Sequence, residues 1–466
     1  MGIRIRRFRT SAALKNSASA MVGNAVNILV KFVAQRVFVQ VLGIQFLGLN
    51  GILSNVISAL NIVELGISNA IIYNLYEPIK KHDVKTVKSL LQFYRKAYNI
   101  IALITTVAGI AIMPFLHLIV REPVDGVNMY FAYLLSLLGT VASYLLSYRQ
   151  SVLYATENGR ITTNVQTICN VISLTIQTAL LLITQNYYLY LAVAPIMFIV
   201  KNVILHIIAG KKYPVIRGKD VTKLDKSIEK DIFKKIRALF IHKVSSFIIF
   251  STDNIIISSF INVATVGLYS NYHMIISAVE TVLIQAIQAL TPTVGNVLTD
   301  KNTRRNYILF RKIRHISFII ALASSAGILL LSDTVISLWL GKEYTLPTIT
   351  LLILVLVHFQ KLMRLSYSVF KEAAGIFHED RFVPVIESLI NIVVSVVLVL
   401  WIGLPGVFIG TFVSSFALWF YSYPKFVYQK LFNRSRKQYY MEMLAYMLIF
   451  SIVILIVLHI KGWMGI

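Results

Sequence analysis

The sequence NILVKFVAQRVFVQ, residues 27–40, lies inside an apolar stretch that runs from about residue 17 to residue 42. A stretch of this length crosses a bilayer as an α-helix, because roughly 20 residues rising about 1.5 Å each span the hydrocarbon core. Two cations, Lys31 and Arg36, interrupt it. A charge at the centre of a membrane helix costs about 2.5 to 3.5 kcal/mol on insertion scales, so these cations indicate a functional site.

The rest of the chain has the composition of a membrane protein. Of the 466 residues, 57% are hydrophobic and 14% are charged, and the mean hydropathy is +0.72. The apolar residues come in long runs rather than in amphipathic stripes. The single cysteine, Cys169, excludes an intrachain disulfide. We therefore predict an all-α, polytopic membrane protein.

The hydropathy pattern predicts about thirteen membrane spans, with twelve and fourteen as the limits. The expected spans cover residues 17–42, 47–76, 95–119, 128–153, 161–184, 187–209, 237–260, 265–292, 313–339, 347–370, 382–401, 404–424 and 440–460. If the N-terminus is cytoplasmic, the outer connections hold only three of the 45 Lys and Arg residues, namely Arg121, Lys342 and Lys461. This charge asymmetry predicts a cytoplasmic N-terminus and, for an odd number of spans, an external C-terminus.

The net charge of +25 follows mainly from this topology. The basic clusters flank the predicted inner ends of spans, where anionic lipid headgroups are the expected partners and nucleic acid is not. The sequence contains no Walker-type glycine loop, no metal-ligand spacing of Cys and His, and no serine nucleophile elbow. We therefore expect a protein that is not an enzyme and has no catalytic residues, cofactor or metal.

The chain contains two halves that resemble each other. When the chain is aligned with itself so that Gly48 meets Gly267, the letters IIAL at 100–103 meet the same letters at 319–322 without a gap. Parallel repeats of this kind move about a shared central cavity in transporters. The predicted domains are a six-helix bundle over 1–209, a basic cytoplasmic linker over 210–236, a second six-helix bundle over 237–424, and an extra C-terminal transmembrane helix within 425–466.

Polar side chains recur at intervals of three and four on several spans, so each set lies on one face of its helix. Lipid does not tolerate such a face, whereas a water-filled cavity does. The residues expected to form the polar lining of the cavity are Asn24, Asn27, Gln35, Asn61, His273, Ser277 and His358. The acids expected to balance the cavity charge or to bind a coupling ion are Glu64, Asp253 and Glu280.

Each cation within a span also has a structural interpretation. Those that lie too deep to reach the interface are Lys31, Arg36, Lys361 and Arg364. Their alternative role is an ion pair with one of the three acids named above. The cations toward the cytoplasmic ends of their spans, where long side chains reach the interface, are Arg149, Lys201 and Lys243. Glu387 is expected to be an interface carboxylate.

Residues 41–83, VLGIQFLGLNGILSNVISALNIVELGISNAIIYNLYEPIKKHD, followed by a basic segment and the third span, resemble the Wzx-type oligosaccharide flippases. These flippases form the polysaccharide-transporter branch of the superfamily that also contains multidrug and toxin extruders and peptidoglycan-precursor flippases. The resemblance extends in hydropathy and loop sizes over nearly the whole chain. Members often have twelve or fourteen spans, whereas thirteen are expected here.

The resemblance implies two six-helix bundles around a central cavity, in the bacterial plasma membrane. It implies alternating-access transfer of undecaprenyl-diphosphate-linked oligosaccharide from the inner to the outer leaflet, with other polysaccharide assembly proteins as further partners. In this role, the four deep cations would bind the diphosphate, which carries about two negative charges. The alternatives are a cation-coupled small-molecule exporter of the same superfamily, which the deep cations disfavour, and a membrane polysaccharide polymerase or ligase, which the short outer connections disfavour.

Overall fold

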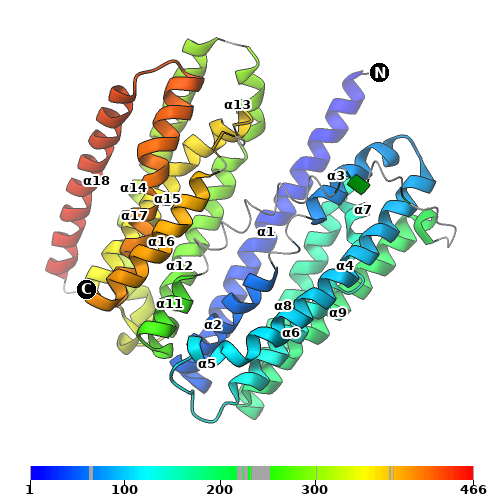
Figure 1. The fold of residues 1–466 in the computed structure, drawn as a ribbon, viewed down its shortest axis with the longest axis horizontal. Helices are drawn as coiled ribbons and strands as arrows, with labels where there is room; N and C mark the ends of the chain where they lie inside the picture. Colours follow the sequence, from blue (N-terminus) through cyan, green and yellow to red (C-terminus); the bar gives the residue numbers. More distant parts are fainter. Residues whose placement is uncertain are drawn as a thin grey trace. The chain divides into compact units, whose positions relative to one another are not determined.

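The computed structural model describes residues 2–61, 64, 67–217, 224, 229–230, 232, 252–300, 302–376, 379–380 and 382–464. Over these residues the regular structure is entirely helical (Figure 1). The chain divides into two compact units, Met1–Phe247 and Ile248–Ile466. The division falls beyond the predicted linker at 210–236, and the predicted domain boundaries stay predictions.

The first unit contains long helices connected by short turns. Its helices are α1 (Gly2–Leu42), α2 (Ile44–Leu60), α3 (Ile67–Lys80), α4 (Val84–Ile112), η2 (Met113–Phe115), α5 (Leu116–Ile119), α6 (Met129–Tyr144), η3 (Ser147–Arg149), α7 (Gln150–Ala155), α8 (Gly159–Thr184), α9 (Tyr187–Lys212) and η4 (Pro214–Arg217). Helix α1 packs against α8, and α6 and α8 both pack against α9.

The second unit also consists of long helices joined by shorter segments. Its helices are α11 (Asp253–Phe260), α12 (Val263–Gln288), α13 (Thr291–Leu298), α14 (Thr303–Trp339), η5 (Lys342–Tyr344), α15 (Thr348–Ala373), α16 (Val383–Ile402), α17 (Leu404–Ser414), η6 (Leu418–Leu431) and α18 (Arg436–Met464). Helix α16 packs against α17, and α14 packs against α15.

The described residues include ten helical stretches long and apolar enough to cross a membrane, or eleven if the bent pair Met129–Tyr144 and Ser147–Ala155 is one span. Two expected spans are not among them. The span expected at 47–76 is divided between α2 and α3, and the span expected at 237–260 lies largely outside the described residues, with α11 at its end. The predicted class, an all-α polytopic membrane protein, is confirmed.

The helix boundaries repeat at the interval that the sequence predicts. Helices α2, α4 and α6 begin at Ile44, Val84 and Met129, and their counterparts α12, α14 and α15 begin at Val263, Thr303 and Thr348. Each pair of starts is separated by the same offset that relates Gly48 to Gly267. The two halves therefore share the positions at which these helices begin.

Helices α4 and α14 also share their N-cap chemistry. Asp83 accepts a hydrogen bond from the Thr86 N–H, and Asn302 accepts one from the Arg305 N–H. The Thr86 hydroxyl and N–H hold the pKa of the Asp83 carboxyl below its usual range. Equivalent caps at equivalent positions are further evidence that the halves fold from similar local signals.

The C-terminal helix α18 is fixed to α14 by two ion pairs. Arg314 lies 2.5 Å from Glu442, and Lys461 lies 2.5 Å from Asp333. Arg314 precedes Asp333 on α14 by as many positions as Glu442 precedes Lys461 on α18, so the two helices run in the same direction. Lys461, expected in an outer connection, is therefore buried in a helix contact.

Candidate functional site

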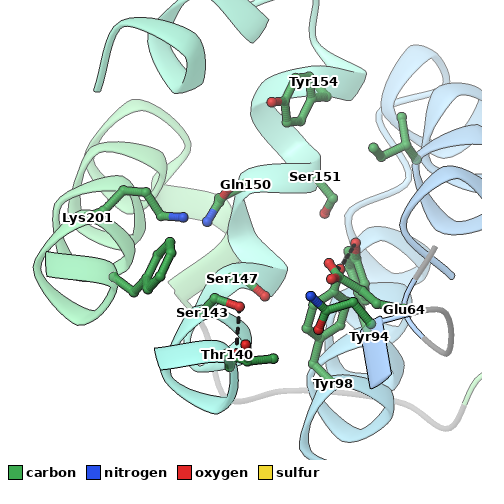
Figure 2. Close-up of a pocket in the computed structure, with 13 residues that line it drawn as sticks. Glu64, Tyr94, Tyr98, Thr140, Ser143, Ser147, Gln150, Ser151, Tyr154 and Lys201 are labelled. Carbon is green, nitrogen blue, oxygen red and sulfur yellow. Dashed lines mark hydrogen bonds between the residues drawn. The ribbon is translucent and has the colours of Figure 1, made fainter. Parts of the chain in front are cut away.

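The first unit contains a partly open cavity of about 560 Å³, lined mainly by polar and aromatic side chains. Its walls come from α3, α4, α6, η3, α7, α9 and the segment that follows α2. Figure 2 shows Lys201 on one side of this cavity, Glu64 and Tyr94 on the opposite side, and Gln150 between them. We call it the unit 1 cavity.

One wall of the unit 1 cavity is a broken helix. Leu146, between α6 and η3, has a left-handed backbone with φ of 61°, which interrupts the helical hydrogen bonds. The buried side chain of Asn202 on α9 donates to the carbonyls of Ser143 and Leu145 at 2.8 and 2.7 Å. Its carbonyl oxygen accepts from Gln150 at 2.9 Å. Asn202 therefore satisfies the carbonyls that the break exposes and fixes Gln150 in the wall.

A second part of the wall follows α2, which ends at Leu60 before α3 begins at Ile67, and the described residues between these helices are Asn61 and Glu64. The Tyr144 hydroxyl donates to Asn61 Oδ1 at 2.6 Å, and the Tyr98 hydroxyl donates to Glu64 Oε1 at 2.9 Å. Tyr94 in turn donates to Tyr98 at 3.2 Å. Interrupted membrane helices are common where transporters bind substrates or ions. Here the described residues after α2 place an amide and a carboxylate in the cavity wall.

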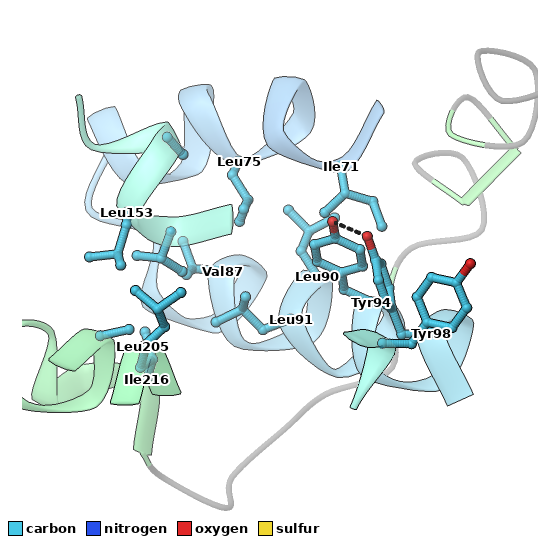
Figure 3. Close-up of a cluster of buried hydrophobic side chains, with 14 of the residues drawn as sticks. Ile71, Leu75, Val87, Leu90, Leu91, Tyr94, Tyr98, Leu153, Leu205 and Ile216 are labelled. Carbon is cyan, nitrogen blue, oxygen red and sulfur yellow. Dashed lines mark hydrogen bonds between the residues drawn. The ribbon is translucent and has the colours of Figure 1, made fainter. Parts of the chain in front are cut away.

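A hydrophobic core supports this wall. Ile71 of α3, Leu90 of α4 and Leu153 of α7 are fully buried against one another's helices (Figure 3). Tyr94 and Tyr98 belong to the same cluster and carry their hydroxyl groups to the cavity side of it. The position of Glu64 is therefore set by rings that are anchored in the core.

Lys201 is the cation of the unit 1 cavity. It lies on α9, is only 8% exposed, and its ammonium group lies 5.1 Å from the centre of the Phe198 ring. Within the described ranges, no carboxylate forms an ion pair with it. The cavity thus holds a cation and an anion on opposite walls without direct contact, an arrangement that suits a polar ligand or water between them.

The predicted residues of α1 lie elsewhere in the first unit. Lys31 and Arg36 are exposed, and the residues of the same helix that are half-buried are Asn24, Asn27 and Gln35. Neither cation forms an ion pair with any residue that the structure describes, and none of the five residues lines the unit 1 cavity. An exposed cation on a membrane span needs water or a polar partner. Their role in diphosphate binding stays a prediction.

In the second unit, Lys361 forms an ion pair. Its ammonium group lies 2.6 Å from Glu280 Oε2, and Glu280 Oε1 lies 3.2 Å from His358 Nδ1. The other ring nitrogen of His358 lies 2.9 Å from the Ser324 hydroxyl. Three predicted residues thus form one cluster, in which Lys361 retains 33% exposure of its side chain.

Arg364 is paired as well, with a partner that the sequence did not indicate. Its two terminal nitrogens lie 2.6 and 3.2 Å from the two carboxylate oxygens of Glu387, which is fully buried. The expectation that Glu387 lies at the interface is therefore wrong. The physical reason is that a bidentate guanidinium compensates the buried carboxylate.

The other predicted residues of the second unit lie apart from these pairs. Asp253 is buried at the start of α11 and accepts from the Thr411 hydroxyl at 3.4 Å. His273 is exposed, with its ring 5.5 Å from that of Tyr269. Ser277 is half-buried and donates to a carbonyl of its own helix at 3.2 Å. In the part of the chain that the structure describes, no group of three or more His, Cys, Asp and Glu side chains is arranged to hold a metal.

The sequence interpretation missed the main features of the unit 1 cavity. Lys201 was expected to reach the interface and is instead buried in the cavity wall, so that expectation is wrong. Arg149 is half-buried beside the Tyr148 ring, and Lys243 lies outside the described residues. The available signal for Lys201 was its position next to Asn202, since adjacent polar residues are rare inside an apolar span.

Comparison with known proteins identifies the family. The family model described as polysaccharide biosynthesis protein matches residues 13–297, which is more than half of the chain. The comparison of this chain with curated proteins found no match.

Solved structures show where the fold occurs. The chain is 14% identical to an inward-facing multidrug resistance MATE family transporter of the MOP superfamily, over 87% of this chain and 96% of that one, with a TM-score of 0.65. It is 15% identical to the Lipid II flippase MurJ in an inward closed conformation, over 97% and 98%, with a TM-score of 0.64. It is 15% identical to a variant of the Vibrio cholerae MATE transporter VcmN, over 88% and 96%, with a TM-score of 0.60. The chain therefore belongs to the polysaccharide biosynthesis protein family and shares its multi-pass helical fold with these transporters and this flippase.

Proposed function

We propose that this protein is a flippase that moves an undecaprenyl-diphosphate-linked oligosaccharide from the inner to the outer leaflet of the bacterial plasma membrane. Membership of the polysaccharide biosynthesis protein family supports the biosynthetic role. The fold shared with a Lipid II flippase and with MATE transporters supports transport by alternating access. The N-terminus is cytoplasmic in this proposal, and other polysaccharide assembly proteins receive the cargo outside.

The observation that carries the proposal is the pair of cations on α1. Lys31 and Arg36 are exposed within the candidate membrane span Ala18–Leu42. Neither has an ion-pair partner among the described residues. A diphosphate would compensate both charges, since guanidinium and ammonium groups are common phosphate ligands. We therefore assign the diphosphate first to these two residues.

Lys361 and Arg364 differ from the α1 cations because both already form ion pairs. Each is already held by a carboxylate, from Glu280 and Glu387 respectively. They can bind the diphosphate only if the cargo displaces these carboxylates. Glu280 would then be released to bind a proton or sodium ion, which couples cargo binding to the charge of the second unit. Glu64 and Asp253 are the other proposed coupling sites.

The test compares Lys31→Ala and Arg36→Ala with Lys15→Ala, which removes an exposed cation from the same helix outside the expected membrane span. A charge-assisted hydrogen bond contributes about 1.5 to 3 kcal/mol, so each α1 variant should reduce transport about ten-fold or more, and Arg36→Lys should keep part of it. Surface polysaccharide and inner-leaflet lipid-linked units are measured at equal membrane protein levels.

Two results would contradict the proposal. A strain without the protein that exports polysaccharide normally and accumulates no lipid-linked units would exclude the flippase function. If the same strain instead becomes sensitive to cationic drugs, and the protein restores resistance, the protein is a small-molecule exporter and the flippase proposal is wrong.

A further inference from the structure

We infer that the unit 1 cavity binds one uncharged sugar ring, with Glu64 and Lys201 as its two hydrogen-bonding poles. This rests on the proposed function, because it assigns to the sugar part of the cargo a place separate from that of the diphosphate. The diphosphate residues Lys31 and Arg36 do not line this cavity.

The charges of the cavity select against a charged ligand. Lys201 is nine-tenths buried and its ammonium group points from α9 toward Gln150 and the cavity (Figure 2). Burying an ammonium ion without a partner is costly, so a ligand that accepts its hydrogen bonds would be favoured. An anion would be attracted by Lys201 but repelled by Glu64, and a cation the reverse, so a single ligand charge gains little net attraction, whereas a neutral ligand with donors and acceptors gains hydrogen bonds at both poles.

Hydroxyl groups fit both poles at once. Glu64 accepts from Tyr98 through Oε1 only, and in the described ranges no residue donates to Oε2. A hydroxyl donates one hydrogen bond and accepts others, so one ring can donate to Glu64 and accept from Lys201 through different hydroxyls. Polar groups at opposite ends of a ring are typical of sugars and absent from most apolar ligands.

The remaining walls suit the faces of a sugar ring. Three aromatic rings line the cavity: Tyr94 on the Glu64 side (Figure 2), Phe198 beside Lys201, and Tyr154 of α7. The C–H faces of a pyranose are apolar and pack on aromatic rings, while the ring edges carry the hydroxyls. A volume of about 560 Å³ lies within the range of small-molecule sites, roughly 300 to 1,000 Å³.

The position of the cavity fits loading from the side on which the cargo is made. On α4 the lining residue Tyr94 is nearer to the helix start at Val84 and Tyr98 lies at its middle, and on α9 Lys201 is nearer to the helix end at Lys212. The sequence predicts both of these helix ends to be cytoplasmic. A sugar ring would therefore reach this cavity from the inner side.

The experiment measures thiol labelling of a cysteine in the cavity wall. Ser147→Cys in a Cys169→Ser background is purified, placed in lipid nanodiscs and reacted with a small maleimide. Methyl α-glucoside, glucosamine, glucuronate and undecaprenyl diphosphate are added separately as probes. Methyl α-glucoside should slow labelling about three-fold or more at saturation, while the two charged sugars have weaker effects and undecaprenyl diphosphate has none.

The pole residues are then neutralised one at a time. Lys201→Met and Glu64→Gln should each raise the sugar concentration needed for half protection about ten-fold or more. Lys211→Met, an exposed lysine at the end of the same helix, is the matched control and should leave it unchanged. Using two pole variants guards against misfolding of one, and circular dichroism with gel filtration verifies the fold of each.

Three results would overturn the inference: no probe slows labelling, a charged sugar protects better than the neutral one, or protection is unchanged in both pole variants. Labelling does not require translocation, so the two proposals fail separately. Sugar protection in a protein whose loss leaves polysaccharide export intact would refute the flippase function alone. A flippase phenotype without sugar protection would refute the sugar site alone.

Discussion

Replacing Arg364 with alanine should destabilise the second unit strongly, because it leaves the carboxylate of Glu387 buried without a partner. The side chains of the pair are 21% and 2% exposed, and two hydrogen bonds join them. Removing one member of a buried pair costs about 3 to 5 kcal/mol, since the remaining charge is uncompensated. The folded-to-unfolded ratio should therefore fall on the order of a hundred-fold to several thousand-fold.

The assay is denaturant unfolding of the purified protein in detergent, monitored by circular dichroism. Variants are compared by the midpoint of the unfolding curve and by the slope of the unfolding free energy against denaturant concentration. Arg305→Ala is the matched control, because Arg305 pairs with Asp300 at 3.4 Å on the surface. Exposed pairs contribute about 0 to 1 kcal/mol, so this control should change little. The double variant Arg364→Met with Glu387→Met removes both charges and should recover most of the stability.

The outcomes separate a structural role from a substrate role. Transport is measured for each variant at matched membrane protein levels. If Arg364→Ala is as stable as the wild type, the ion pair does not support the fold and our reasoning fails. If the double variant is stable yet transports poorly, Arg364 also acts on the cargo, as the sequence suggested.

Two further predictions concern topology and access. A reporter fused after Leu431 should read cytoplasmic and one fused after Gly465 should read external. The reason is that α18 runs in the same direction as α14, whose start the charge asymmetry predicts to be cytoplasmic. Identical readings would contradict this topology. Single cysteines at Asn27 and His358, in the Cys169→Ser background, should differ in reaction with aqueous thiol reagents. Asn27→Cys should react, and the side of the membrane from which the reagent reaches it should change when the lipid-linked substrate is supplied. His358→Cys should react slowly because His358 is 1% exposed. An unreactive Asn27→Cys would argue against a water-exposed face on α1.

The sequence alone determined the class of the protein and the register of its helices. A bilayer requires about 20 apolar residues per helix, so hydropathy located most of the spans, whereas the expected spans at 47–76 and 237–260 are not among the described candidates. The internal repeat fixed the relation between helix starts such as Val84 and Thr303, because each half folds from similar local signals. Asn61 and Glu64 were expected in a central cavity shared by both halves, since polar groups within spans need polar surroundings. The structure places both in the wall of the unit 1 cavity, and the shared central cavity stays a prediction.

Only the tertiary structure decided which charges are paired. Arg364 meets Glu387, a residue expected at the interface, and Lys201 enters a cavity instead of reaching toward headgroups. The break at Leu146 is stabilised by Asn202, which comes from a helix much later in the chain. Hydropathy reports the depth of a residue in the membrane, but the partner across from it depends on how separate helices pack, and a helix can present the same residue to lipid, water or a counter-charge.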